Sequence, residues 1–407
     1  MTDAAISRSS AVPQAAAIYL AIVQFFFAIG WSVYVIFLPK LLEQAGLPKT
    51  IAIWILAADQ VAFMLSDLII GVWIDRVRTT LRRLGPTIAA LTAISCLAFL
   101  LMPQVVRLGK GTAEVALIVA LLVWTTTSSA LRVPPLVILG NHTAKPRLPL
   151  VLALNLSGLA LGGAISPYLG VVLRDMDPRL PFAISSIVLL ATTGGLVWVE
   201  RALARSPDAP SSDAPKAPVH GSGGAMLFFI AMAIAALGFQ LHFFVNSAPN
   251  YLRFAKPGDL DMLMPVFWIG FNIGMFPAGS FTKRFGTLHV MALAAVLGVV
   301  GIAGSILATN LSMLIAAQFI AGCAWGAVFV SAFSAASSLG SPGRVGIAMA
   351  ILWAVLALAT LGRMMMVGGG VTRMPDMGAV IAWGPAVAWL FGGLTLAQAA
   401  RVLRARA

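Results

Sequence analysis

The segment Gly71-Val-Trp-Ile-Asp-Arg76, with the cluster of arginines that continues to Arg83, decides the fold of this chain. It ends an apolar run that begins near Thr50, and a second apolar run begins near Leu84, so we expect a tight loop between two membrane-length segments. In such a loop a glycine lets a neighbouring helix approach closely, an aspartate can face a helix N-terminus or an arginine, and basic residues favour the cytoplasmic side. The alternative is a loop that only sets the topology through its positive charge.

The composition of the whole chain assigns it to the membrane. Of its 407 residues 60% are hydrophobic and 10% are charged, and the mean hydropathy is +0.95. Because such a chain cannot bury its apolar surface in water-soluble cores, we predict an all-α polytopic membrane protein. Cys96 and Cys323 lie in apolar runs and indicate neither a disulfide nor a metal site. The polar start, residues 1–11, predicts no cleavable signal peptide.

Twelve apolar segments are each long enough to cross a bilayer as a helix, which takes about 20 residues. Between the sixth and the seventh lies a stretch rich in proline, serine and glycine, which predicts a disordered linker. We expect a first six-helix bundle over 1–200, a cytoplasmic linker over 201–224 and a second six-helix bundle over 225–407. The expected spans are 17–39, 51–74, 84–103, 114–139, 148–173, 180–199, 225–248, 261–282, 286–308, 312–334, 344–368 and 379–400.

The net charge of +13 is explained by basic loops on one face of the membrane rather than by nucleic acid. With the N-terminus inside, most loop lysines and arginines fall on the cytoplasmic side, which favours both termini in the cytoplasm of a multi-pass protein, most simply in a bacterial inner membrane. The cytoplasmic set is Arg8, Arg76, Arg78, Arg82, Arg83, Lys145, Arg147, Arg201, Arg205, Lys216, Lys283, Arg284, Arg344, Arg401, Arg404 and Arg406. The outer set is Lys40, Lys49, Arg107, Lys110, Arg174, Arg179, Arg253, Lys256 and Arg373.

The two halves of the chain share short motifs in the same order. Pro39-Lys-Leu-Leu42 recurs as Pro249-Asn-Tyr-Leu252, and Gly71-x-x-x-Asp75-Arg76 recurs as Gly279-x-x-x-Lys283-Arg284. Both pairs keep nearly the same offset on either side of the linker, which predicts a duplicated six-helix unit.

On these residues the chain resembles the major facilitator superfamily of transporters. The signature loop of that family, between helices two and three, reads Gly-x-x-x-Asp-Arg/Lys-x-Gly-x-Arg/Lys-Arg/Lys, and the sequence supplies Gly71, Asp75 and Arg76 in register. Arg78 replaces the second glycine, and the basic pair arrives two residues late. The second copy carries Lys283 in place of the acid.

The resemblance implies two six-helix bundles with inverted 3+3 repeats around a central cavity that opens alternately to each side. Helices 1, 4, 7 and 10 would line the cavity, and helices 2, 5, 8 and 11 would form the rest of the interface. In that family the signature loop latches helix 2 against helix 11 when the cytoplasmic side is closed. The residues that would act as the gate are Gly71, Asp75, Arg76, Gly279, Lys283 and Arg284.

Asp59, Asp67, Arg132 and Arg363 are ionisable side chains at membrane depth, where an unpaired charge is costly. His242 can also titrate. Depth along the helices allows a buried Asp67–Arg132 pair and places Asp59 and Arg363 on helices that the fold makes neighbours. We predict that Asp59 or Asp67 carries a coupling proton, with His242 next, and that Arg132 contacts an anionic solute or pairs with Asp67. The alternative is that these groups only hold helices together.

Polar and aromatic side chains recur on the helices expected to face the cavity. The predicted substrate-binding set is Trp31, Tyr34, Arg132, Gln240, His242, Asn246, Gln318, Trp325 and Arg363. Gln24 and Ser331 belong to the same pattern. Pro134 and Pro135 directly after Arg132 predict a bend in a cavity helix. Glycines from Gly158 onward loosely resemble an antiporter motif, although close helix packing explains them better.

The sequence lacks phosphate-binding loops, nucleophile elbows and clustered metal ligands, so we expect neither an enzyme nor a bound cofactor. The leading interpretation is a proton-coupled secondary active transporter of a small solute, with an anion favoured by the intramembrane arginines. The alternatives are a proton-driven exporter of drugs or metabolites, and a membrane sensor or scaffold that does not transport. The expected partners are the solute, protons and the lipid bilayer, with no nucleic acid, and the chain is expected to act as a monomer.

Overall fold

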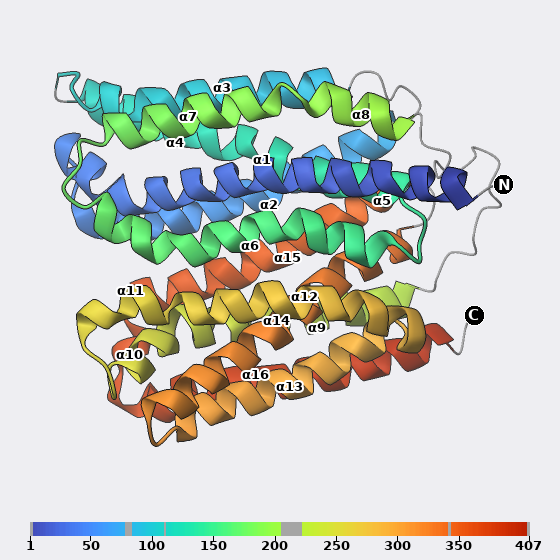
Figure 1. The fold of residues 1–407 in the computed structure, drawn as a ribbon. Coiled ribbons are helices and arrows are strands. Elements are labelled where there is room, and N and C mark those ends of the chain that lie inside the picture. The colour runs from blue at the N-terminus through green and yellow to red at the C-terminus, as the bar shows by residue number, and fades with distance from the viewer. Residues whose placement is uncertain (1–2, 78–83, 110, 205–221, 341–342, 405–407) are drawn as a thin grey trace.

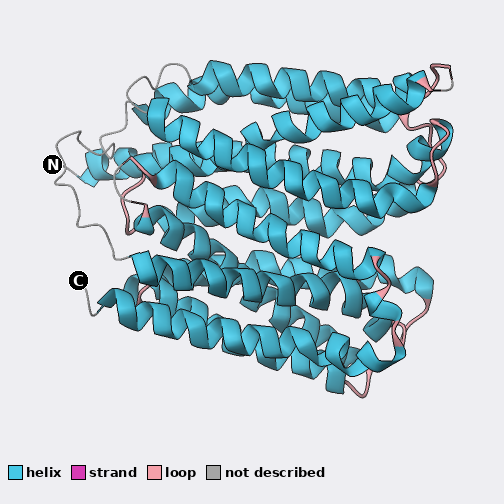
Figure 2. Cartoon of the chain, turned by 180° about the vertical axis from the view of Figure 1, so that it is seen from behind, coloured by secondary structure: helices cyan, strands magenta, loops and turns pink. Residues whose placement is uncertain are grey.

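The computed structural model describes residues 3–77, 84–109, 111–204, 222–340 and 343–404. Every regular element among these residues is helical (Figure 2). Twelve helical segments of this described part are long and apolar enough to cross a membrane. The predicted all-α polytopic fold with twelve spans is therefore confirmed.

The first six spans form one bundle. Its elements are α1 (Asp3–Gln44), α2 (Ala52–Val77), α3 (Leu84–Val105), a fourth span of α4 (Thr112–Ser128), η3 (Ser129–Leu131) and α5 (Val133–His142), then α6 (Leu148–Val172), and a sixth span of α7 (Arg179–Thr193) and α8 (Leu196–Ala204). A short 3-10 turn, η1 (Lys49–Ile51), precedes α2.

The last six spans form the second bundle. Its elements are α9 (Ser222–Leu241), the π-helical turn η4 (His242–Asn246) and α10 (Ser247–Tyr251), then α11 (Leu260–Leu263) with α12 (Pro265–Phe285), α13 (Thr287–Leu307), α14 (Leu311–Leu339), α15 (Val345–Gly368) and α16 (Gly378–Arg404). Three 3-10 turns complete it: η5 (Pro257–Asp259), η6 (Val371–Arg373) and η7 (Pro375–Met377). Both ends of the predicted linker are helical, in α8 and α9, and residues 205–221 lie outside the described part.

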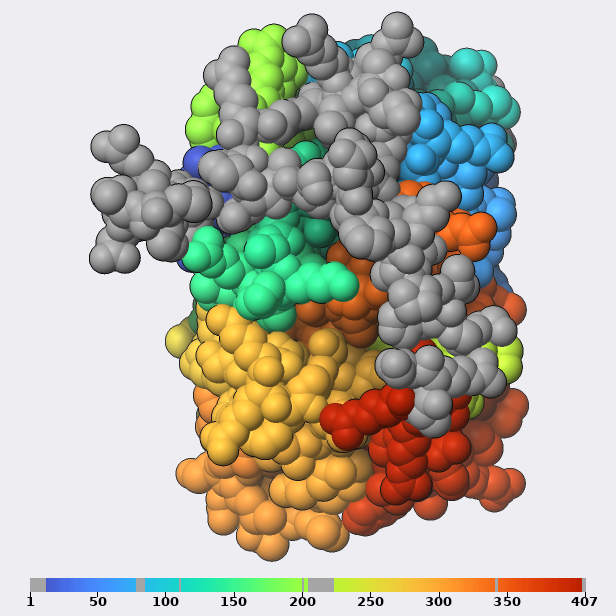
Figure 3. All heavy atoms as spheres, turned by 90° about the vertical axis from the view of Figure 1, so that its right-hand side faces the viewer, coloured from blue at the N-terminus to red at the C-terminus, as the bar shows by residue number. Residues whose placement is uncertain are grey.

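The two bundles lie side by side, and the start of α1 and the end of α16 lie at the same end of the molecule, which we call the terminus side (Figure 1). Figure 3 looks at that end, where atoms of the first half border atoms of the second. The bundles meet chiefly through α2 against α15 and α6 against α12. Spans 2, 5, 8 and 11 therefore form the interface that the resemblance implied.

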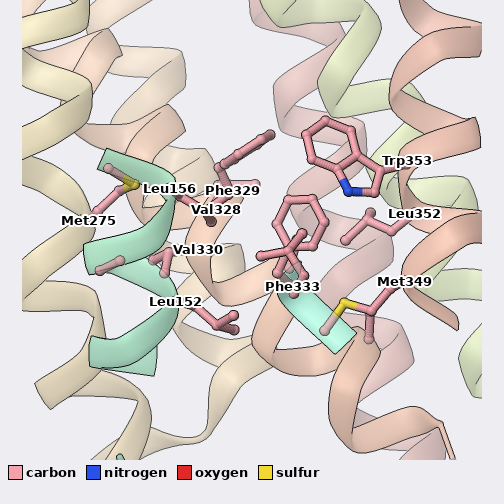
Figure 4. Packing of buried hydrophobic residues seen from close by; sticks show 14 of the residues in the cluster. Leu152, Leu156, Met275, Val328, Phe329, Val330, Phe333, Met349, Leu352 and Trp353 are labelled. Carbon is pink, nitrogen blue, oxygen red and sulfur yellow. The ribbon is translucent and has the colours of Figure 1, made fainter. Parts of the chain in front are cut away.

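One continuous apolar core joins the bundles. Leu152 and Leu156 of α6 lie near Met275 of α12 and Phe329 of α14, with Trp353 of α15 beyond them (Figure 4). Closely packed helix pairs meet at glycines: a Cβ atom at Gly270, Gly274, Gly322 or Gly326 would lie 2.0–2.3 Å from the backbone oxygen of the facing helix. Gly158 is equally close to α1, with its Cβ position 1.8 Å from the Ala21 oxygen. Helix packing thus explains these glycines.

One expectation about the deciding segment is wrong. Residues Gly71 to Arg76 do not form a loop, because α2 remains helical as far as Val77. A helix that must cross the bilayer and reach the facing bundle gains backbone hydrogen bonds by continuing. The arginines at positions 78, 82 and 83 lie outside the described residues.

Candidate functional site

A cavity of about 600 Å³ lies between the two bundles. Its walls come from spans 1, 2, 4 and 5 of the first bundle and spans 7, 8, 10 and 11 of the second. On α1 the lining residues lie between Gln24 and Val35, in the middle of the helix. On α2 they lie between Ile53 and Phe63, in the half of the helix away from the terminus side. The aromatic side chains of the wall are Phe27, Trp31, Phe63, Phe239, Phe243, Phe244, Trp268, Phe271, Trp325, Phe329 and Trp353.

Five residues of the predicted substrate-binding set line this cavity. They are Trp31, Arg132, Gln240, Trp325 and Arg363. Sequence reasoning missed the lining residues Ser32, Gln60, Trp268, Trp353 and Thr360. Helical spacing could have found Thr360, which lies three residues before Arg363 on the same face of α15. The others carry no comparable signal.

Four residues of the set do not line the cavity, so the prediction that they face it is wrong. Tyr34 donates to Asp59 Oδ2 at 2.6 Å, and His242 Nε2 lies 3.2 Å from Gln318 Oε1. Asn246 Nδ2 donates to the Ile381 carbonyl at 2.8 Å. These hydrogen bonds are made within each residue's own bundle, as is usual for buried polar side chains, although Gln318 Nε2 has no partner among the described residues.

Arg132 sits at a break in the fourth span. α4 ends at Ser128, a 3-10 turn follows, and α5 starts at Val133. Proline lacks an N–H, so the Leu131 carbonyl has no donor at Pro135. The side chain of Gln24 on α1 donates to that carbonyl instead. The predicted irregularity is present as this 3-10 break, and the Arg132 side chain next to it lines the cavity.

Arg132 forms the predicted buried ion pair. Its Nη2 lies 3.2 Å from Asp67 Oδ2, and Asp67 is fully buried. The guanidinium carbon also lies 4.2 Å from the ring centroid of Phe63 and 4.7 Å from that of Trp353. Because Phe63 belongs to α2 and Trp353 to α15, Arg132 connects the two bundles through cation–π contacts.

Arg363 occupies a different environment in the same cavity. Its Nε donates to Gln240 Oε1 at 2.9 Å, and Gln240 Nε2 donates to Thr360 Oγ1 at 2.8 Å. The guanidinium carbon lies 4.7 Å from the ring centroid of Phe244. Within the described chain no carboxylate lies at ion-pairing distance, so Arg363 does not pair with Asp59.

Asp59 is buried behind the cavity wall. Tyr34 and Thr125 donate to its two carboxyl oxygens at 2.6 and 2.8 Å. Trp31, which lines the cavity, stacks on Trp124 with ring centroids 5.6 Å apart, and Trp124 contacts the Tyr34 ring at 4.6 Å. Asp59 itself does not line the cavity, although Trp31 and the next residue, Gln60, do.

On the terminus side, α2 and α15 are in direct contact. The Asp75 carboxylate accepts hydrogen bonds from the backbone N–H groups of Gly346 and Ile347, both at 2.8 Å. These are orphan donors of the first turn of α15, where a negative charge also complements the helix dipole. At Gly71 an added Cβ would lie 2.5 Å from Ala350 Cβ and 2.7 Å from the Gly346 oxygen. Only glycine permits this approach.

The second copy of the motif makes a similar but weaker contact. A Cβ at Gly279 would lie 3.4 Å from Pro149 Cβ, at the start of α6. Lys283 and Arg284 are exposed, as is Arg76 in the first copy. A lysine cannot accept hydrogen bonds from a helix N-terminus, so α6 lacks the carboxylate cap that Asp75 gives α15. Among the described residues no group of three or more His, Cys, Asp or Glu side chains could hold a metal ion.

Solved structures with this fold include several transporters. A bacterial homologue of the iron transporter ferroportin, in an outward-facing state, gives a TM-score of 0.73 at 13% identity over 95% of this chain and 99% of its own. The human organic anion transporter MFSD10 (TETRAN) gives 0.62 at 14% identity over 96% and 99%. A proton:xylose symporter bound to a bromodeoxyglucose gives 0.66 at 12% identity over 96% and 95%.

Comparison with curated proteins gave no match. The family model described as Major Facilitator Superfamily matches residues 20–362. That match covers more than half of the chain, and the observed twelve spans in two bundles agree with it. The protein therefore belongs to the Major Facilitator Superfamily.

Proposed function

We propose that the protein is a secondary active transporter that moves a small solute across the membrane by alternating access. The observation that carries this proposal is the cavity between the bundles, together with the contacts that close it on the terminus side. In this proposal the structure represents the state that is closed at the terminus side, and Gly71, Asp75 and Arg76 form the main gate. The equivalent contact with α6, at Gly279, Lys283 and Arg284, would open and close together with the main gate.

The cargo is proposed to be an anion. Among the described residues that line the cavity, the charged side chains are those of Arg132 and Arg363, within a wall rich in aromatic side chains. Proton coupling is proposed through Asp59 or Asp67, because a buried carboxyl group can exchange one proton per cycle as its surroundings change. Two proteins with the same fold support these proposals: one is an organic anion transporter, and the other is a proton:xylose symporter.

We propose the orientation of the protein in the membrane from the distribution of basic residues along the sequence. The terminus side would face the cytoplasm of a bacterial inner membrane, because basic residues concentrate in the segments on that side. We propose that the monomer is functional, since the cavity lies wholly within one chain. The exporter alternative loses much of its support, because close packing against α1 accounts for Gly158 and Gly162 of α6.

Uptake into proteoliposomes under an imposed pH gradient tests the proposal. A panel of radiolabelled small anions, cations and neutral solutes is applied, and at least one anion is expected to accumulate. Gly71→Leu should reduce that accumulation at least about tenfold, because the new side chain would meet the α15 backbone. The matched control is Gly384→Leu, since a Cβ at that position meets no atom within 4 Å. No accumulation of any solute by folded protein would contradict the proposal.

A further inference from the structure

The two arginines of the cavity differ in how far their charge is already compensated. Arg132 has the Asp67 carboxylate at 3.2 Å and an aromatic ring against its guanidinium from each bundle. Among the described residues, Arg363 has only the amide oxygen of Gln240 at 2.9 Å and the ring of Phe244 at 4.7 Å. An arginine remains ionised at any physiological pH. The uncompensated positive charge of the cavity therefore belongs to Arg363.

The hydrogen bond from Nε fixes which part of the Arg363 guanidinium remains available. Gln240 is itself held by its bond to Thr360 Oγ1, so its oxygen stays directed at Arg363 Nε. Within the described chain, neither terminal nitrogen of Arg363 has a hydrogen-bond partner. Nη1 and Nη2 together present a planar pair of donors, which matches the two oxygens of a carboxylate. The side chain is half-buried, so an incoming anion would meet it partly desolvated.

The wall next to Arg363 suits an apolar body. Phe244 contacts Phe243 at 4.9 Å between ring centroids, and Phe243 contacts Trp268 at 5.4 Å. Farther along, Phe239 stacks on Trp325 at 4.6 Å with an angle of 14° between the rings. Rings with these spacings offer faces on which a planar group can stack. The cavity of about 600 Å³ accommodates a molecule of one or two fused rings.

We propose that Arg363 and Gln240 form the anion-binding end of the solute site, and that the solute is a small monocarboxylate with a planar apolar body. One uncompensated charge favours one negative charge on the ligand, because a second would be buried without a partner. This inference rests on the proposed transport function and gives it a substrate class. It also assigns anion recognition to Arg363, whereas Arg132 serves chiefly as the link between the bundles.

Calorimetric titration of the purified protein in lipid nanodiscs tests this proposal without requiring transport. The probes are naphthoate, its neutral analogue naphthamide, and a naphthalene dicarboxylate. Naphthoate is expected to bind tightest, because only this probe matches both the single charge and the aromatic wall. Arg363→Gln should weaken naphthoate binding about 10- to 100-fold, the usual effect of losing hydrogen bonds to a charged group. The affinity of Arg363→Lys for naphthoate should lie between those of the wild type and Arg363→Gln, since lysine keeps the charge but lacks the planar pair of donors.

Arg373→Gln is the matched control, because Arg373 is exposed in η6, outside the cavity. Size-exclusion profiles and melting temperatures show that each variant is folded. The proposal is wrong if naphthoate does not bind the wild-type protein, if naphthamide or the dicarboxylate binds equally well, or if Arg363→Gln stays within about twofold of the control. Loss of binding in Arg132→Gln alone would move the anion site to Arg132.

The two proposals can fail separately. If another panel solute accumulates in proteoliposomes but naphthoate does not bind, the transport function stands and the substrate class is wrong. If naphthoate binds through Arg363 and no solute accumulates, the site stands and the transport function is wrong.

Discussion

At the scale of single residues, the two buried aspartates of α2 differ in their partners. Asp67 faces the permanent cation of Arg132, whereas Asp59 is held by two hydroxyl groups, from Tyr34 and Thr125. Neutralising Asp67 would leave Arg132 buried and unpaired, which is costly. Neutralising Asp59 leaves no cation behind, and both hydroxyls can reorient. Asp59 is therefore the better candidate for the coupling proton.

We expect Asp59→Asn to abolish solute accumulation driven by a pH gradient and to spare solute exchange at equal pH. An amide keeps hydrogen bonds with neighbouring hydroxyls but cannot exchange a proton. Both quantities are measured in proteoliposomes, with Tyr34→Phe as the control that removes one hydrogen bond and keeps the carboxyl group. Accumulation at the wild-type level in Asp59→Asn would move the proton site to Asp67.

Arg132→Gln should destabilise the protein by about 3–5 kcal/mol, because it strands the Asp67 carboxyl group in the core. Adding Asp67→Asn should restore most of that loss, since the remaining pair is neutral. Chemical unfolding in detergent measures the free energy for both variants. If the single variant is as stable as the wild type, the pair contributes nothing to stability.

Sequence reasoning found the Asp67–Arg132 pair because depth along two helices is readable from residue counts. It failed for His242, Tyr34 and Asn246 because depth does not give the direction of a side chain around the helix axis. For His242 and Asn246 the π-helical turn adds a further error, since it shifts the helical phase without a sequence signal. The burial of Asp59 likewise depends on side-chain packing, in which rings of α1 meet Trp124 of α4.

At the scale of elements, the broken fourth span depends on one side-chain bond. Gln24 donates to the Leu131 carbonyl, whose ordinary helical donor is missing at Pro135. The break could be predicted because its cause is the Pro134-Pro135 pair, visible in the sequence. Its partner on α1 could not, because depth does not show which side of the helix Gln24 faces.

We expect Gln24→Leu to lower the free energy of unfolding by about 1–3 kcal/mol, because it leaves a buried carbonyl without a donor. Pro135→Ala in the same chain should recover part of this loss, because alanine supplies the missing N–H to Leu131. Equilibrium unfolding of the two single variants and the double variant gives the coupling between the sites. Additive effects of the two changes would show that the Leu131 carbonyl is not the connection.

At the scale of the whole molecule, the fold was predictable because each span is specified by its own length and apolarity. Contacts between the bundles were predictable only where a motif records them, as at Gly71 and Asp75. The cavity wall needed the structure, because it combines eight spans whose relative rotation no local pattern encodes. The same reasoning explains why the deciding segment was expected as a loop: hydropathy ends near the membrane surface, whereas α2 continues.

Alternating access requires the bundles to separate on the terminus side, and a cross-link there should stop the cycle. At Gly140 on α5, a Cβ would lie 2.9 Å from Ser337 Oγ on α14, so cysteines at both positions are within reach of a disulfide. In a chain with Cys96→Ala and Cys323→Ala, the oxidised Gly140→Cys/Ser337→Cys variant should lose nearly all transport and keep solute binding. A reducing agent should restore transport, and each single cysteine variant serves as a control. Full transport by the cross-linked protein would show that the terminus side does not open during the cycle, and the proposed mechanism would then be wrong.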